Sequence, residues 1–444
     1  MGSFGSLLTA VAGLRAQSSA MQNISGNIAN SQTPGFKRVE TSFVDLVPQQ
    51  PLTRQVSGSV TSFSRATNSL AGEFLATNRD TNVAISGNGF FVVGQPPGQT
   101  SGVNRQGPEL YTRRGDFELD RRGYLVNGAG YALRGTMLDR NTGAPMPNQG
   151  SGFIQITQEL LGRLDPRPTA QVTYQAQLPT TPGNVSGDIQ WPAPPATAPL
   201  TIGAGAAEED FLRNSVPGGS VTVYNGIGAI GSMNLRWVRT GPATAGPASE
   251  WALYYESRSG TPLDAWRRVD PAVTFNAQGQ LSSAPQLNAS AVEINNVVFQ
   301  DITLDITGMT NNDTGGSVIP TFIEQDGFGV GRYESVSVSE DGVVSIAYSN
   351  GQVRPVAEIS IVGFFAPNAL RRVDGGAFEA TRESGDPSVA LARSTLTSGG
   401  VESSNTDISE EFAKMIVTQQ AYTANTRVIS TAQDMIREVL NVVR

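Results

Sequence analysis

The sequence predicts a mainly β fold with α-helical termini. Two or more β-sandwich or barrel-like domains are expected in sequence between N- and C-terminal coiled-coil-type helices that pair. Three observations lead to this prediction. Apolar residues recur at three- and four-residue steps near both ends of the chain. The long stretch between the ends consists of short β-type runs separated by Gly and Pro. Helices with such a thin apolar seam are marginal in isolation and need a packing partner.

The first helix is predicted from about Ser3 to Ile28, ending near Asn30, because Pro34 and Gly35 cannot continue it. Arg15 is the only charged residue before Lys37, which favours a helix packed on several sides over a solvated one. The residues expected to carry subunit assembly here are Leu7, Val11, Leu14, Met21, Ile24, Ile28 and Asn30.

The last helix is predicted to start at the cap Asn405–Asp407 and to end at about Val442. Glu410 and Glu411 follow the cap, where acids complement the positive end of the helix dipole. Phe412 and Tyr422 could form a ligand patch, but their helical spacing favours a packing seam. The seam residues expected to carry assembly are Phe412, Met415, Tyr422, Ile429, Ile436 and Leu440. A chain with these two ends is predicted to be completed by copies of itself.

Composition shifts divide the chain into four predicted parts. They are a terminal helical domain (1–32 and 400–444), an extended connector (33–72 and 386–399), a discontinuous β domain (73–149 and 317–385) and an inserted outer β domain (150–316).

Strand patterns support both β domains. A β-hairpin is predicted around Gly87-Asn88-Gly89, and a second is predicted over 111–126. Further strands are predicted at 221–224, 233–238, 251–255, 302–306, 334–338, 343–348 and 359–365.

Composition also limits the function classes. The 444 residues include no Cys and no His, which removes thiol nucleophiles, zinc–thiolate sites and the commonest general base. No catalytic, cofactor-binding or metal-binding residue is therefore predicted. The net charge is -8 and no basic cluster is present, so nucleic acid is not an expected partner. Membrane insertion is not expected either, because no apolar run approaches the length of a span.

Two sets of residues match patterns of other functions, a dinucleotide site and a glycosidase. Residues 226–231 match the G-x-G-x-x-G pattern of dinucleotide sites, but strand-like alternation follows where a helix is required, so a glycine hairpin is predicted. Asp301, Asp305 and Glu324 could supply a glycosidase acid pair, yet they are scattered along the chain.

Four blocks, in order, resemble the bacterial flagellar axial proteins, the family of rod, hook and hook-associated subunits. The blocks are Gly13–Ser18 with Ile24–Asn30 and Thr33–Lys37; Ala84–Val93; Tyr111–Gly115; and Val401–Ile408 with Gln420–Asn425. The large insert, together with the blocks Gln325–Gly329 and Tyr348–Pro355, resembles the hook branch of the family in particular.

This resemblance implies a structural subunit that assembles into a flexible tube outside the cell, joining rod to filament and transmitting torque. It implies partners of five kinds, namely copies of itself, the distal rod, the hook cap, the hook–filament junction proteins and the flagellar export apparatus. It further implies export through the flagellar apparatus without a cleaved signal peptide. A distal rod or hook-associated protein is the alternative within the family.

A secreted β-rich carbohydrate-binding protein or glycosidase is the alternative from another class. It would need an exposed aromatic platform. The tryptophan candidates are Trp191, Trp237, Trp251 and Trp266.

Overall fold

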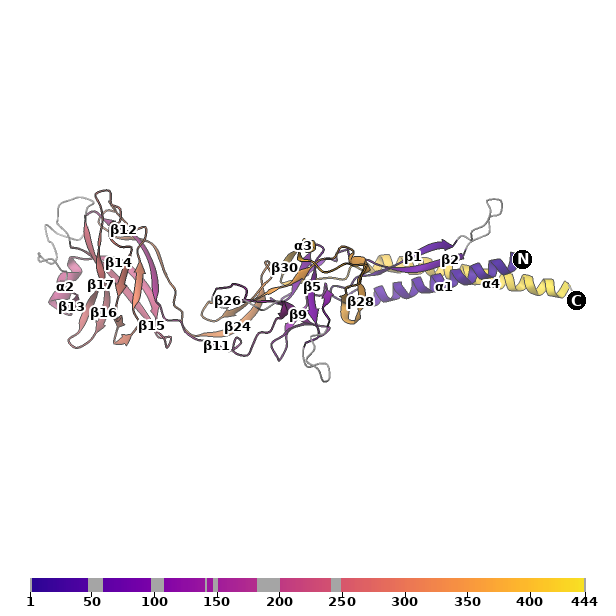
Figure 1. The fold of residues 1–444 in the computed structure, drawn as a ribbon, viewed down its shortest axis with the longest axis horizontal. Coiled ribbons are helices and arrows are strands. Elements are labelled where there is room, and N and C mark those ends of the chain that lie inside the picture. Colours follow the sequence, from indigo (N-terminus) through magenta and orange to yellow (C-terminus); the bar gives the residue numbers. More distant parts are fainter. Residues whose placement is uncertain are drawn as a thin grey trace. The chain divides into compact units, whose positions relative to one another are not determined.

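The structure is a computed structural model that describes residues 2–46, 59–96, 108–139, 142–146, 151–181, 200–240 and 249–442. It divides into two compact units. Unit 1 comprises Met1–Leu161, Glu334–Ala347 and Val353–Arg444, and unit 2 comprises Gly162–Tyr333 and Tyr348–Gln352. The N- and C-terminal helices both belong to unit 1, where they pack together (Figure 1). The predicted fold class, mainly β with terminal helices that pair, is confirmed.

The helices and strands of unit 1 are α1 (Gly2–Ala29), β1 (Val39–Leu46), β2 (Ser59–Ala66), β3 (Phe74–Ala76), β4 (Val83–Ser86), β5 (Phe90–Gly94), β6 (Leu110–Thr112), β7 (Phe117–Leu119), β8 (Leu125–Asn127), β9 (Ala132–Met137), β10 (Gly152–Phe153), β24 (Gly331–Val338), β25 (Val343–Tyr348), β26 (Val353–Ile359), β27 (Ile361–Val362), η1 (Pro367–Ala369), β28 (Arg371–Val373), η2 (Asp374–Gly376), β29 (Ala377–Glu379), α3 (Val389–Ala392), β30 (Thr395–Ser398), β31 (Gly400–Glu402) and α4 (Ile408–Val442). The first three residues of β24 and the last residue of β25 belong to unit 2.

Unit 2 holds β11 (Arg163–Leu164), β12 (Gln171–Pro179), β13 (Thr201–Gly203), α2 (Ala206–Arg213), β14 (Val216–Tyr224), β15 (Ile230–Arg239), β16 (Glu250–Ser259), β17 (Asp264–Thr274), β18 (Gln286–Ala289), β19 (Glu293–Ile294), β20 (Val297–Val298), β21 (Ile302–Asp305), β22 (Thr310–Asn312) and β23 (Ile319–Gln325).

Between α1 and the β sheet of unit 1, the chain forms a two-stranded ribbon of β1 and β2. The sequence predicts only an extended connector here, because Ser- and Thr-rich strands show little alternation. The strands pair antiparallel over their whole length and lie against α1. The Asn23 side chain amide on α1 donates to Thr41 Oγ1 at 2.9 Å and to Ser64 Oγ at 3.1 Å. The helix therefore supplies the packing surface that the ribbon needs.

The main sheet of unit 1 runs in the order β24-β25-β26-β9-β5-β6-β29-β28. Its strands draw on both halves of the unit, so the segment after unit 2 completes a sheet begun before it. An aromatic cluster covers part of the sheet, with the rings of Phe90 and Phe378 5.8 Å apart and those of Tyr111 and Phe364 4.8 Å apart.

The hairpin predicted around Gly87-Asn88-Gly89 is wrong, although both of its strands exist. Strand β4 pairs with β30, whereas β5 pairs with β6, β9 and β27. The two glycines allow the chain to turn against other segments. A Cβ on Gly87 would meet the Arg393 carbonyl at 2.6 Å, and one on Gly89 would meet the Ile361 side chain at 2.5 Å. The second predicted hairpin includes the antiparallel pair of β7 and β8.

Unit 2 is one curled sheet in the order β14-β15-β16-β17-β18-β21-β12-β22, with β23 paired to β12. The first strand packs against β23, where Gly219 lies next to Pro320 and Ile323, so the sheet closes into a barrel-like domain. Strand β23 belongs to this unit, although the predicted insert ends at residue 316. The glycines of 226–231 end β14 and begin β15 in an antiparallel hairpin, as predicted.

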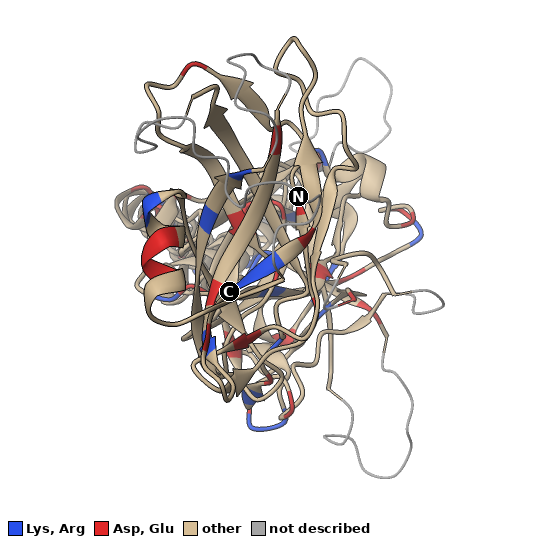
Figure 2. Ribbon diagram, turned by 90° about the vertical axis from the view of Figure 1, so that its left-hand side faces the viewer, with Lys and Arg blue, Asp and Glu red and all other residues tan. Residues whose placement is uncertain are grey.

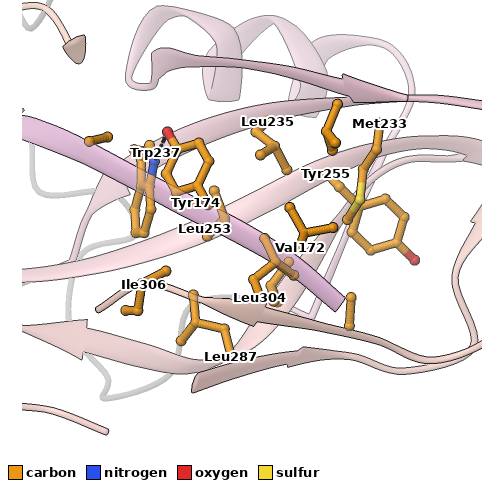
Figure 3. Packing of buried hydrophobic residues seen from close by; sticks show 14 of the residues in the cluster. Val172, Tyr174, Met233, Leu235, Trp237, Leu253, Tyr255, Leu287, Leu304 and Ile306 are labelled. Atoms are coloured by element: carbon orange, nitrogen blue, oxygen red, sulfur yellow. Dashed lines mark hydrogen bonds between the residues drawn. The ribbon is translucent and has the colours of Figure 1, made fainter. Parts of the chain in front are cut away.

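The core of this barrel is a continuous cluster of buried apolar side chains (Figure 3). Trp237 donates from Nε1 to the Tyr174 hydroxyl at 3.1 Å, and that hydroxyl donates to the Gly218 carbonyl at 2.7 Å. Both polar groups of this buried pair are thereby satisfied. Outside the barrel, α2 covers a second small cluster that contains Phe211 and Trp266.

Lys and Arg residues are interspersed with Asp and Glu residues over both units (Figure 2). No helix in the described part of the chain is both long and apolar enough to cross a membrane.

Candidate functional site

Helix α1 packs through a stripe of mostly small residues. The buried positions follow one another at three- and four-residue steps, which places them on one face of the helix. They are Ala10, Gly13, Ala16, Ala20, Ile24 and Asn27. At Gly13, an added Cβ would stand 3.0 Å from Asn425 of α4. Small side chains therefore let the two helices approach closely.

The buried residues of helix α4 include both polar and apolar side chains. Glu411, Thr418 and Ala432 are buried, and Asn425 is half-buried between them. The Asn27 side chain amide donates to Glu411 at 2.9 Å and to the Val39 carbonyl at 3.0 Å, and its oxygen accepts the Val39 N–H at 2.9 Å. One asparagine thus ties α1 to both α4 and the ribbon.

The structure places most of the predicted α1 seam beside this stripe and not within it. Leu7, Val11, Leu14, Met21 and Ile28 are half-buried, and only Ile24 of the predicted set is buried. At 100° per residue, the half-buried residues centre roughly 100° around the helix from the buried stripe. Asn30 acts locally, because its side chain amide donates to the Gly26 carbonyl at 2.9 Å.

The predicted α4 seam is only partly covered within one chain. Met415, Ile429 and Ile436 are half-buried, whereas Phe412 and Tyr422 are 50% and 38% exposed. The side chain of Leu440 lies outside the described residues. Further large apolar side chains on α4 are exposed, namely Ile416, Val417, Val428 and Met435. Within one chain, the helix pair therefore leaves much of its apolar surface uncovered.

Beneath the helices, three buried charged residues form a cluster that we call the joint: Lys37, Arg113 and Glu402. Lys37 forms an ion pair with one oxygen of Glu402, and Arg113 Nη1 lies 3.3 Å from the other. Glu402 also accepts the N–H of Gly72 at 2.7 Å. A single carboxylate thus compensates two buried cations.

Main-chain carbonyls complete the joint. Lys37 Nζ donates to the Leu70 carbonyl at 2.5 Å, and Arg113 Nη2 donates to the Gly87 carbonyl at 2.6 Å. Burial lowers the pKa of the Lys37 ammonium, Glu402 opposes this shift, and the Arg113 cation adds to it. Burial likewise lowers the pKa of Arg113, again against the effect of Glu402. Because a buried charge without a partner is costly, these contacts hold five chain segments together, around residues 37, 70–72, 87, 113 and 402.

A second set of contacts links the joint to the start of α4. Asn405 accepts the N–H of Arg38 at 2.7 Å, and Arg38 Nη1 lies 2.8 Å from Glu410. Lys414 lies 2.8 Å from the other oxygen of Glu410, and hydrogen bonds from Lys414 and Arg38 lower the pKa of that carboxyl. The Asp407 side chain accepts the N–H groups of Ser409 and Glu410 and so caps the helix.

Sequence reasoning did not select the joint as a site. Its residues nevertheless lie in the blocks that carry the family resemblance, because Lys37 ends Thr33–Lys37, Arg113 lies in Tyr111–Gly115 and Glu402 lies in Val401–Ile408. The few charged residues in these mostly uncharged blocks are the signal that could have identified them.

Evidence for a metal or sugar site is not found in the described part of the chain. No three Asp or Glu side chains come together there as a metal site would require. Trp237, Trp251 and Trp266 are buried in unit 2, so they offer no exposed platform, and Trp191 lies outside the described residues.

Three family models match the chain, in the order in which its blocks occur. They are described as flagella basal body rod protein (residues 7–37), flagellar hook protein FlgE/F/G D1 domain (residues 84–162) and flagellar basal body rod FlgEFG protein C-terminal (residues 397–442). The first and third cover most of α1 and α4, and together the three include all residues of the joint.

Full-length relatives are similar along the whole chain. The chain is 28% identical to flagellar hook protein FlgE of Rhizobium meliloti, covering 100% of both proteins. It is 29% identical to flagellar hook protein FlgE of Salmonella typhimurium, covering 97% of this chain and 98% of that one. The crystal structure of Helicobacter pylori flagellar hook protein FlgE2 matches with a TM-score of 0.50 at 16% identity, covering 74% of this chain and 100% of that one. That structural match supports the fold.

Proposed function

The chain belongs to the bacterial flagellar rod and hook protein family, and from that premise we propose that it polymerises through its terminal helices into the flagellar hook. It is a structural subunit of the hook, which is an extracellular part of the flagellum.

One observation supports polymerisation through the helices. Two paired helices expose large apolar side chains on several sides, among them Phe412, Ile416 and Val428. Helix α1 adds Leu8, which is 68% exposed, and contains a single charged residue, Arg15. A large number of exposed apolar side chains on two helices is the kind of surface that marks an interaction site. Copies of the same chain offer a matching surface.

The proposed assembly residues follow from this reading. They are the half-buried α1 residues Leu7, Val11, Leu14, Met21 and Ile28 with Ile24 and Asn30, and the α4 residues Phe412, Met415, Tyr422, Ile429, Ile436 and Leu440. The small-residue stripe and the joint hold the helices in place, which leaves the half-buried and exposed members of this set available to neighbouring subunits.

The proposal also covers the other flagellar proteins that the chain contacts and the route by which it is exported. The distal rod, the hook cap and the hook–filament junction proteins are the proposed contacts at the two ends of the polymer. Export is proposed through the flagellar apparatus without a cleaved signal peptide. No catalytic reaction is assigned to the chain.

Deleting the gene and imaging isolated basal bodies by electron microscopy tests the function. Rods without hooks are the expected result. Missing or truncated rods would instead place the chain in the rod, and intact flagella would overturn the proposal.

Removing residues 1–30 tests the role of α1 separately. Assembly is expected to fail, because α4 loses its partner and half of the proposed surface. A glycosidase or carbohydrate-binding protein built on unit 2 would keep its activity after this deletion.

A further inference from the structure

The face of α1 that points away from α4 carries two exposed residues in line. Leu8 and Arg15 are seven residues apart, so they lie on the same side of the helix about 10.5 Å apart along its axis. Leu8 is 68% exposed, Arg15 is exposed, and no described residue forms an ion pair with Arg15. This surface, which we call the Leu8–Arg15 face, combines an uncovered apolar side chain with the only charge of the helix.

A groove lies on the other side of the helix pair, between α1, β1 and α4. Its volume is about 420 Å³, and Ala20, Ile24 and Val39 give it an apolar lining. Phe43, also in the lining, is 46% exposed.

The groove also has an acidic lining. Three carboxylates, Glu40, Glu410 and Glu411, stand against two cations, the ammonium of Lys414 and the guanidinium of Arg38, which lies 3.0 Å from Glu40 and 2.8 Å from Glu410. Glu411 is buried, whereas the Glu40 and Glu410 side chains are 38% and 47% exposed, so each keeps a solvent-facing part beside its ion pair with Arg38 that an incoming cation can reach.

The two surfaces cannot meet within one chain, because Ala20 and Ile24 of the groove lie on the buried face of α1, roughly 150° around the helix from Leu8 and Arg15. The two surfaces are complementary in apolar character and in charge. The Leu8–Arg15 face offers an apolar side chain beside a cation, and the groove offers an apolar hollow beside carboxylates. A contact between two different surfaces of identical chains is heterologous, and it continues from copy to copy without closing on a dimer.

We propose that this groove is the docking site for the Leu8–Arg15 face of a second copy of the chain. Leu8 fills the apolar hollow, and Arg15 pairs with Glu40 at its edge. The inference rests on the proposed polymerisation and names the two surfaces that meet. It also gives a reason for the isolated arginine in a helix otherwise free of charge.

Charge reversal tests the pairing in cells that carry the gene as their only copy. Arg15→Glu and Glu40→Arg are each expected to reduce hooks on isolated basal bodies about tenfold or more, because each places like charges together in the contact. The double variant restores the opposite charges and is expected to recover hooks. As a matched control, Glu40→Arg combined with Arg427→Glu, an exposed reversal on α4, is expected to stay defective.

The outcomes separate this inference from the proposed function. Normal hooks with Arg15→Glu would overturn the docking, as would a double variant that stays defective although its purified monomer keeps the helical circular dichroism of the wild type. A defect in Glu40→Arg together with normal hooks in Arg15→Glu would point to a different occupant of the groove and would also overturn the docking. Hooks in the gene-deletion strain would instead refute the proposed function.

Discussion

Gly13 of α1 lies directly against Asn425 of α4, so closely that a Cβ on residue 13 would stand 3.0 Å from both polar atoms of the amide. The amide nitrogen of Asn425 already donates to the Ala421 carbonyl at 3.0 Å within its own helix. The spacing of the two helices at this level is thus set by the absence of a side chain at residue 13.

Gly13→Leu is expected to destabilise the helix pair by about 1–3 kcal/mol, the usual effect of overpacking. The measurement is the midpoint of thermal unfolding of the monomer, followed by helical circular dichroism. Gly26→Ala is the matched control in the same helix, since a Cβ there meets nothing within 4 Å. It should stabilise the helix by up to about 1 kcal/mol. Equal effects of the two substitutions would contradict the close contact.

Glu402→Gln is expected to destabilise unit 1 by about 3–5 kcal/mol, because it leaves Lys37 and Arg113 buried without a counter-charge. All four tryptophans lie in the residue range of unit 2, and α1 and α4 lie in unit 1. In denaturant, the helical circular dichroism should therefore shift while tryptophan fluorescence stays unchanged. Lys37→Met is the comparison, since it leaves the pair of Arg113 and Glu402 intact and should have the smaller effect. The larger effect from Lys37→Met would refute this account of the joint.

The start of α4 is expected to weaken in acid through Glu410. Hydrogen bonds from Lys414 and Arg38 lower the pKa of this carboxyl in the folded chain. A carboxyl whose pKa is lower when folded contributes stability above its unfolded pKa and loses that contribution as the pH falls through the folded value. Glu410→Gln should therefore reduce the pH dependence of the helical unfolding midpoint in this acid range. An unchanged pH profile would show that Glu410 does not contribute.

Tyr174→Phe is expected to destabilise unit 2 by about 1–3 kcal/mol, because it removes the acceptor of the buried Trp237 N–H. Denaturant unfolding followed by tryptophan fluorescence measures this loss, with the helical signal unaffected. The control is Tyr333→Phe, at a residue that is 37% exposed, where a change within about 0.5 kcal/mol is expected. A similar loss from both variants would argue against the buried hydrogen bond.

Periodicity determined the two helices from sequence alone, because a repeat of three and four residues is a local property that survives in any context. It also predicted apolar seams on them; Phe412 and Tyr422 of these seams are exposed in one chain, and most of the other described members are half-buried. The hairpin of β14 and β15 was equally predictable, since glycines between two alternating runs act locally. The four-part division of the chain stays a prediction.

The tertiary structure alone decided which segments meet. Gly87 and Gly89 indicate a turn. In the structure these glycines pack against Arg393 and Ile361, and β4 and β5 pair with strands of different sheets. Lys37 and Glu402 are 365 residues apart, and no local pattern shows that they form an ion pair. The small-residue stripe of α1 is likewise invisible to a search for large apolar residues. Local propensity specifies the helices and strands, whereas the burial of charge and the close approach of backbones determine which of them pack together.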